Sequence, residues 1–484
     1  MNQLLLDRST GEIGPNTFAR LQSIRLLTSF CPAPLYRFDG GERGTAVNDG
    51  EASSSDNPSS IWAHQAGVSA LALERFDGRF LVSGASDASI KIWDLEQVNN
   101  KPSSSSSSSD HFKPIASIPQ SPRTHKFGIT HLSFYPFDPA AFLSTSYDQT
   151  LKVWSTNEAR LSASFTLSSK VYTHTISPIA SHLLVACGTQ HPAVRLVDLR
   201  SGSSIQSLTG HGGAIFAASW SPRHEYVLAT GSVDGTVRIW DIRRAGACVG
   251  MLDHEDSLGL YYNGMLDATN GKVRIRGAAK AHAGPVNGLT WTDDGSYIIS
   301  AGHDQRIRVW DAATGRNTLS RFGPSIKNSQ LAGVTMFTSP VGLNHPGKEL
   351  LFWPNESEIL IMDLHDGQTM TRLRGTGAMV SGVRSAKGSE RSVKNRITSI
   401  VWRGAGGGGG SSGVVMGGAN MPGAIISAHL DGQIRAWIPQ PDDDEANDDG
   451  DDDANQDNDE DRSKKRKALN DVFNSLMGKK ITFT

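Results

Sequence analysis

The stretch Gly231-Ser-Val-Asp234-Gly-Thr-Val-Arg-Ile-Trp240-Asp241 decides how this chain folds. Its Asp-Gly pair favours a tight turn, and the aspartate side chain can cap that turn. The residues that follow alternate between polar and apolar up to the tryptophan, which is typical of a half-buried strand. The stretch therefore predicts a tight turn that leads into a strand.

The same motif occurs four more times, and in each copy the aspartate lies six residues before the tryptophan. A histidine precedes the aspartate by 22 or 23 residues in four of the five copies. The positions are His64, Asp87 and Trp93; His125, Asp148 and Trp154; His211, Asp234 and Trp240; His282, Asp304 and Trp310; and Asp431 with Trp437. Recurrence in step predicts a repeat architecture in which each copy forms one structural unit.

Two further stretches, 171–199 and 331–364, have the strand pattern of the repeats without the tryptophan, and Val197 stands in its place in the first. Counting them gives seven units. The sequence thus predicts an all-β fold, a seven-bladed WD-repeat β-propeller over residues 23–440. Residues 23–38 are expected to supply a strand that pairs with the last blade and removes its free edge.

The histidines and aspartates of the repeats resemble catalytic groups but are better explained structurally. In WD repeats the upstream histidine, a strand serine or threonine, the turn aspartate and the tryptophan indole form a hydrogen-bonded chain that locks the blade. Elsewhere, His254-Glu255-Asp256 has no second histidine at metal-ligand spacing, and Ser411 in Gly409–Gly413 follows a glycine run. The sequence predicts no enzyme, metal or cofactor, with carboxylates meeting in the central channel as the alternative.

Composition narrows the setting. The 484 residues contain three cysteines, too few and too scattered for a disulfide framework or zinc site. Apolar runs fall well short of the roughly 18 residues that cross a membrane. A reducing compartment and no membrane insertion are expected.

Four long connections between the repeats are predicted to be solvated, flexible insertions. They are residues 39–60, 97–124, 254–280 and 385–424.

Residues 441–484 form a tail in which charge is segregated. Residues 442–461 hold 13 acidic side chains and no basic ones, whereas 462–484 hold seven basic and one acidic. The net charge of −2 therefore leaves about +5 for residues 1–441 (−2 + 13 − 6), which demands no direct nucleic-acid binding. Such an acidic run predicts disorder.

Two features of this tail suggest partners. Lys464, Lys465, Arg466 and Lys467 resemble a nuclear import signal, with a solvated charge run or nonspecific nucleic-acid contact as alternatives. The apolar spacing over residues 469–477 predicts a short amphipathic helix, which either binds a partner groove or packs on the propeller.

The N-terminal residues 1–22 predict a helical arm. Pro15 favours a helix start, and Phe18, Leu21 and Ile24 recur at helical spacing. Leu4-Leu5-Leu6 adds an apolar patch. The alternative is a frayed tail with one helix on its own propeller.

Several stretches outside the generic repeat pattern make the chain similar to the Cockayne syndrome group A family, receptor subunits used in transcription-coupled DNA repair. They include Val171-Tyr-Thr-His-Thr-Ile-Ser-Pro178, Leu208-Thr-Gly-His211, Val237-Arg-Ile-Trp-Asp-Ile-Arg-Arg-Ala245 and Ala281-His-Ala-Gly-Pro-Val-Asn-Gly-Leu289. The serine and glycine insertions and the charged tail depart from the family.

The resemblance implies a non-catalytic, nuclear substrate receptor of a cullin-four-type RING ubiquitin ligase. In the family, an N-terminal arm and a Trp-Asp-x-Arg ending meet an adaptor, the large subunit of damaged-DNA-binding protein. The matching residues here are Leu4, Leu5, Leu6, Phe18, Trp240, Asp241 and Arg243. Further implied partners are the cullin and RING subunits, the Cockayne syndrome group B ATPase and stalled RNA polymerase II. A WD-repeat scaffold in RNA processing or chromatin stays open as the other reading.

Overall fold

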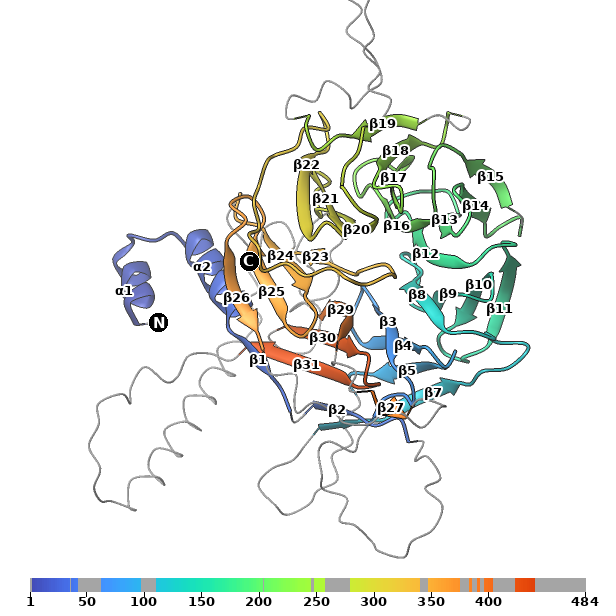
Figure 1. Cartoon of the computed structure of the whole chain (residues 1–484). Helices are drawn as coiled ribbons and strands as arrows, with labels where there is room; N and C mark the ends of the chain where they lie inside the picture. The colour runs from blue at the N-terminus through green and yellow to red at the C-terminus, as the bar shows by residue number, and fades with distance from the viewer. Residues whose placement is uncertain are drawn as a thin grey trace, which may run out of the picture. The chain divides into compact units, whose positions relative to one another are not determined.

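The computed structural model describes residues 2–34, 36–41, 62–96, 110–202, 204–244, 248–256, 279–339, 347–374, 383–384, 390–391, 396–403 and 423–439. Within residues 1–440, antiparallel sheets stand around a common centre as the blades of a ring (Figure 1). The predicted all-β, seven-bladed propeller is confirmed. The import cluster and the amphipathic helix predicted for the tail lie outside the described residues.

From the inner strand outward, blades 1 to 3 comprise β3 (Val68–Leu73), β4 (Phe80–Ala85), β5 (Ile90–Asp94) and β7 (Pro114–Ile118); β8 (Ile129–Phe134), β9 (Ala141–Ser146), β10 (Thr150–Ser155) and β11 (Leu161–Thr166); and β12 (Val171–Ile176), β13 (Leu184–Thr189), β14 (Val194–Asp198) and β15 (Ser204–Leu208). Blades 4 and 5 comprise β16 (Ile215–Trp220), β17 (Val227–Ser232), β18 (Val237–Asp241) and β19 (Cys248–Leu252); and β20 (Val286–Trp291), β21 (Tyr297–Gly302) and β22 (Arg306–Asp311). Blades 6 and 7 comprise β23 (Phe337–Thr338), β24 (Leu350–Pro354), β25 (Ile359–Asp363) and β26 (Thr369–Leu373); and β29 (Ile397–Arg403), β30 (Ala424–His429), β31 (Ile434–Pro439) and β1 (Phe30–Pro32).

The outer strand of blade 7 comes from the other end of the ring's sequence. In β1, Phe30 pairs with Pro439 and Pro32 with Trp437. This confirms that residues 23–38 supply a strand that covers the edge of the last blade. Residues 23–28 are not part of it, because they end a helix, α2 (Pro15–Thr28), which follows α1 (Asn2–Thr10).

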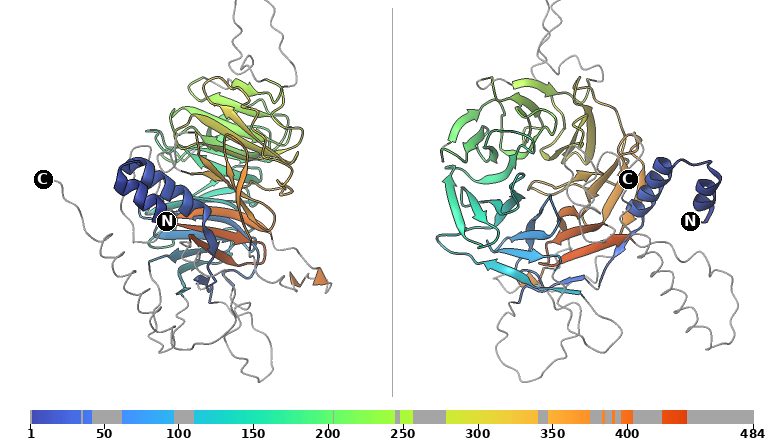
Figure 2. Two further views of the ribbon diagram at one scale, coloured as in Figure 1. Left: turned by 90° about the vertical axis from the view of Figure 1, so that its left-hand side faces the viewer. Right: turned by 180° about the vertical axis from the view of Figure 1, so that it is seen from behind.

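Each inner strand begins on one face of the ring and ends on the other, and we call these the top and bottom faces. At the top, the rings of Tyr172 and Phe216, near the starts of β12 and β16, are 4.8 Å apart. At the bottom, the Trp291 indole at the end of β20 donates to the backbone oxygen of Ser219 near the end of β16, at 3.1 Å. Figure 2 (left) shows the ring edge-on, with the helices beside it.

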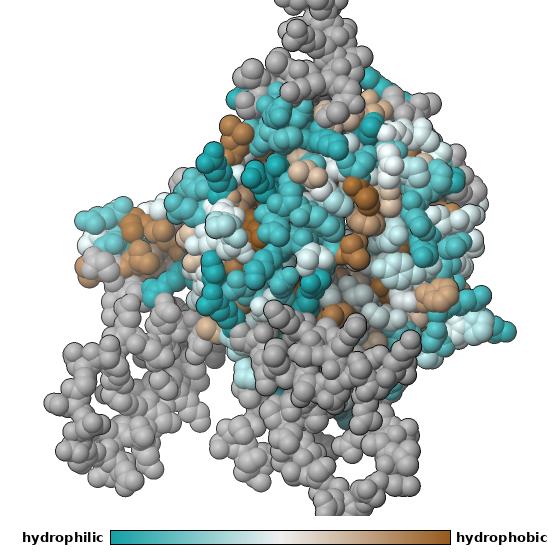
Figure 3. Space-filling model, in the orientation of Figure 1, coloured by the Kyte–Doolittle hydropathy of each residue, from teal (hydrophilic) through white to brown (hydrophobic). Residues whose placement is uncertain are grey.

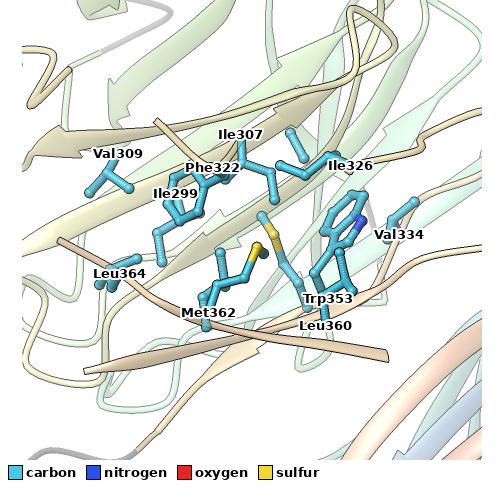
Figure 4. Close-up of a cluster of buried hydrophobic side chains, with 13 residues drawn as sticks. Ile299, Ile307, Val309, Phe322, Ile326, Val334, Trp353, Leu360, Met362 and Leu364 are labelled. Atoms are coloured by element: carbon cyan, nitrogen blue, oxygen red, sulfur yellow. The ribbon is translucent and has the colours of Figure 1, made fainter. Parts of the chain in front are cut away.

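Apolar side chains fill the space between neighbouring blades. Between blades 5 and 6, Ile299 and Val309 lie in one cluster with Trp353 and Met362, all fully buried (Figure 4). Burying a side chain of this size contributes roughly 1.5–3 kcal/mol. The alternation of each strand thus supplies the walls that hold the ring rigid.

Two predicted insertions prove shorter than expected. Residues 97–124 include β7, the outer strand of blade 1, and β6 (Asp110–Phe112), which pairs in parallel with β2 (Tyr36–Phe38). Residues 385–424 include β29, the inner strand of blade 7. Low-complexity neighbours hid these short strands. The remainder, residues 42–61, 97–109, 257–278 and 404–422, lies outside the described residues, which also include a small hairpin, β27 (Val383–Arg384) with β28 (Glu390–Arg391).

Candidate functional site

Blade 2 contains the complete hydrogen-bonded chain of a WD repeat. The Trp154 indole donates to the Ser144 hydroxyl at 2.7 Å, and that hydroxyl lies 2.7 Å from Nε2 of His125. Nδ1 of His125 lies 2.9 Å from the Asp148 carboxylate. Because a carboxylate only accepts, Nδ1 carries the proton and Nε2 accepts from the serine.

The other histidine-containing blades repeat this chain with one variation. In blade 5, His282 contacts Asp304 directly at 2.9 Å and Ser300 at 2.8 Å, and Trp310 donates to Ser300. In blades 1 and 4 a turn hydroxyl stands between the two charged partners. The bridges run from His64 through Ser89 to Asp87, and from His211 through Thr236 to Asp234. The indoles of Trp93 and Trp240 donate to Ser83 and Thr230.

Blade 7 builds its chain from a residue that the sequence pattern missed. Trp437 donates to Ser427 at 2.8 Å, and Nε2 of His429 lies 2.9 Å from the same hydroxyl. Asp431 pairs with Arg435 at 3.0 Å. The signal was a histidine two residues before the turn aspartate, where the other four copies have Ala85, Ser146, Ser232 and Gly302.

Burial keeps these imidazoles neutral. Burial and the nearby Lys91 lower the pKa of His64 to about 3. Burial likewise lowers the pKa of His211, His282 and His429. Burial acts to raise the pKa of Asp148, but hydrogen bonds from His125 and Thr150 outweigh it and lower that pKa to about 2. Each set therefore links an ionised acceptor to a buried indole, which suits holding strands together.

The Trp-Asp-x-Arg ending of β18 lies on the bottom face of blade 4. Arg243 donates to both carboxylate oxygens of Asp241, at 3.0 and 2.6 Å, while its side chain is 64% exposed. Its guanidinium also lies over the Tyr226 ring, 5.2 Å from the centroid. Trp240 is fully buried, so the prediction that its side chain meets an adaptor is wrong. Arg243 is the accessible member of the motif.

The N-terminal arm consists of two helices, and α2 runs past the predicted arm boundary at residue 22. Leu5 and Leu6 are 48% and 56% exposed, and Leu21 and Leu26 are also exposed. Figure 3 shows the resulting brown surface over the helices. Leu4 is half-buried. Phe18 is only 4% exposed beneath the Arg8 guanidinium, so its prediction as an adaptor anchor is wrong.

The arm is fixed to the ring at its second helix. Leu27 and Phe30 are buried in the core of blades 6 and 7, and the Thr371 hydroxyl of β26 donates to the Thr28 carbonyl at 3.2 Å. Because Phe30 pairs with the last residue of β31, the arm leaves the ring on the bottom face. Arg243 lies on this same face.

Two cavities also open on the bottom face. One, of about 310 Å³, lies between the inner strands of blades 1 to 3 and is lined by His131, Ser133 and His174. The other, of about 320 Å³, lies between blades 4 and 5 beside Asp241 and Asp311. No cluster of three or more metal-ligating side chains occurs in the described part of the chain.

The remaining sequence candidates play local roles. His254 contacts the Lys280 carbonyl at 2.8 Å across the gap left by residues 257–278. His303 contacts the Gln330 carbonyl at 2.6 Å. Ser411 lies outside the described residues. Among the described helices, none is long and apolar enough to span a membrane.

The WD domain, G-beta repeat model matches residues 57–94, 113–155, 202–241 and 275–311, which belong to blades 1, 2, 4 and 5. The chain is 27% identical to radiation-sensitive protein 28 of Saccharomyces cerevisiae over 38% of each chain. It is 29% identical to ribosome biogenesis protein ytm1 of Aspergillus niger over 51% of this chain and 53% of that one. It is 30% identical to WD repeat-containing protein ATCSA-1 of Arabidopsis thaliana, over 78% of this chain and 88% of the relative. With this coverage and the seven WD-type blades, the chain belongs to the Cockayne syndrome group A family of WD-repeat proteins.

Proposed function

We propose that this protein is the substrate-recognition subunit of a cullin-four-type RING ubiquitin ligase that acts in transcription-coupled nucleotide excision repair in the nucleus. The WD40 propeller is a fold that typically serves as a non-catalytic scaffold. The observation that carries the proposal is the shared position of the arm and Arg243 on the bottom face. A docking partner on that face meets both at once.

The arm supplies the apolar part of the proposed adaptor contact. Leu5 and Leu6 are exposed on α1, a short helix that has little reason to expose leucines unless a partner covers them. Buried apolar anchors carry most of the binding energy in such interfaces, whereas charges at the edge tune rate and orientation. The large subunit of damaged-DNA-binding protein is the proposed adaptor.

Arg243 supplies the polar part. Its pairing with Asp241 fixes the guanidinium in one orientation, so little side-chain freedom is lost when a partner carbonyl or carboxylate binds the remaining donors. The ring then holds target lysines near a ubiquitin-charged enzyme and raises their effective concentration. The proposed repair partners are the Cockayne syndrome group B ATPase and stalled RNA polymerase II.

Calorimetry with the purified adaptor tests the proposal. Deleting residues 1–22 should abolish binding, while Leu27 and β1 stay in place to close the ring. A double variant, Leu5→Glu with Leu6→Glu, should weaken binding at least tenfold, and Arg243→Ala should weaken it less. The matched control is Ile115→Glu, since Ile115 is 51% exposed on β7. Adaptor binding that survives the arm deletion would refute the docking model.

The alternative is a nuclear WD scaffold in RNA processing, and the similarity to ytm1 over half of each chain favours it. Affinity purification of the tagged chain from nuclear extract separates the two. Recovery of a cullin with its adaptor supports the ligase role, whereas recovery of ribosome-assembly factors alone supports the alternative.

A further inference from the structure

A row of four aromatic side chains crosses the top face from blade 2 to blade 4. It consists of Phe127, Tyr147, Tyr172 and Phe216, which we call the aromatic strip. The rings of Tyr147 and Tyr172 are 6.0 Å apart at 80°, and those of Tyr172 and Phe216 are 4.8 Å apart at 80°. Three separate repeats thus contribute to one continuous surface.

The strip is exposed beyond what the fold requires. Phe127 is 61% exposed and Tyr147 39%. Tyr172 and Phe216 are half-buried. Aromatic rings that remain this accessible in a row are typical of protein-binding surfaces, where tyrosine and phenylalanine supply much of the contact energy.

The backbone beneath the strip is held firmly. The Ser146 hydroxyl donates to the Phe127 carbonyl at 2.6 Å, and the Tyr147 amide donates to the Gly128 carbonyl at 3.3 Å. A Cβ on Gly128 would lie 2.9 Å from the Ser86 carbonyl of blade 1, so the loop is pressed against its neighbour. A strip fixed in this way loses little conformational entropy when a partner binds.

The charges beside the strip are basic. Lys126 adjoins Phe127, Lys170 lies two residues before Tyr172, and both side chains are exposed. The nearby Asp148 carboxylate is 5% exposed and accepts from His125, Thr150 and the Lys126 amide. The accessible charge here is therefore positive, and it complements an acidic ligand.

We infer that the aromatic strip binds an acidic peptide segment of a partner protein that carries aromatic or proline side chains. The apolar side chains pack against the rings while the carboxylates approach Lys126 and Lys170. Neighbouring rings stand at 80° to one another and so alternate faces with edges. That suits side-chain packing better than a run of stacked nucleic-acid bases.

This surface is independent of adaptor docking, because it lies on the face opposite Arg243 and the arm. A partner can bind the strip while the bottom face is occupied. The inference can also fail or succeed without any consequence for the proposed ligase role.

Selection of a random 12-residue phage-displayed peptide library on the full chain tests the inference, followed by fluorescence anisotropy of the enriched peptides. The enriched sequences should combine aspartate or glutamate with aromatic residues or proline. Phe127→Ser and Lys170→Glu should each weaken them about tenfold or more. The matched control is Phe137→Ser, because Phe137 is 46% exposed on the bottom face of the same blade; it should leave the affinity unchanged.

Three results would overturn the inference. They are the absence of any enrichment over the Phe127→Ser chain, enrichment of basic peptides, and peptide affinities that Phe127→Ser does not change. Binding of a labelled 20-nucleotide oligothymidine that Phe127→Ser abolishes, without peptide enrichment, would assign the strip to nucleic acid instead. Circular dichroism melting of each variant excludes unfolding as the cause of lost binding.

Discussion

His429 lies two residues after Ser427 on the same strand, and its Nε2 is 2.9 Å from the Ser427 hydroxyl. In the other locked blades the equivalent imidazole comes from the loop before the inner strand. A Cβ on Gly302, the corresponding position of blade 5, would lie 2.6 Å from the His282 ring. Only one imidazole therefore fits beside the buried hydroxyl, and in blade 7 it comes from the blade's own second strand.

Replacing this histidine should destabilise the ring. His429→Ala leaves the buried Ser427 hydroxyl without its imidazole partner and should cost about 1–3 kcal/mol of unfolding free energy. Urea unfolding followed by tryptophan fluorescence measures the loss. The control is His224→Ala, an exposed histidine, which should change the free energy by less than about 0.5 kcal/mol. Equal effects of the two variants would show that His429 does not lock the blade.

The turn aspartates should likewise act on stability. Asp234 accepts from the amides of Gly212 and Thr236 at 2.7 and 2.8 Å and from the Thr236 hydroxyl. Asp234→Ala leaves these donors unpaired and should cost about 1–3 kcal/mol, while Asp234→Asn keeps one acceptor and should cost less. An unchanged melting temperature in Asp234→Ala would contradict a structural role for the set.

Stability should fall in mild acid because the buried histidines fold in the neutral state. The pKa of His64 is about 3 in the folded protein, against about 6.5 in an unfolded chain. Below pH 6.5 the unfolded chain therefore binds more protons, so stability is full above that pH and declines as the pH falls towards 3. This residue alone should remove about 2 kcal/mol between pH 7 and 5.

His64→Gln provides the test of that pH dependence. The variant lacks the titrating group, so its unfolding free energy should fall less steeply than that of the parent between pH 7 and 5. Urea titrations at both pH values measure the two slopes. Parallel slopes would mean that His64 does not fold as a neutral imidazole.

The basic cluster of the tail is proposed to direct nuclear import. Replacing Lys464, Lys465, Arg466 and Lys467 by alanine in a fluorescent fusion should shift the protein towards the cytoplasm. Replacing Lys479 and Lys480, which lie in the same tail, serves as the control. Unchanged nuclear accumulation of the fourfold variant would show that import depends on another signal or on a partner.

The regular blades were predictable because the Asp-to-Trp spacing joins a turn to a strand in a fixed register. β7 was missed because it follows a serine run and has only Ile118 as a deeply buried side chain. His429 was missed because the search required a histidine upstream of the aspartate, whereas this one lies beside it. The burial of Phe18 depends on Arg8 in the preceding helix, a tertiary contact that helical spacing cannot reveal.

The pairing of Phe30 with Pro439 also constrains how the protein is made. The strand that closes blade 7 leaves the ribosome early, but its partner β31 is among the last parts of the ring to be synthesised. Until then the nascent chain carries an open seam with unpaired backbone donors and acceptors on both sides, the kind of edge that recruits other strands. Premature termination before β31 would leave that seam permanently open, so such fragments should depend on chaperones or aggregate even though six complete blades precede the missing strand.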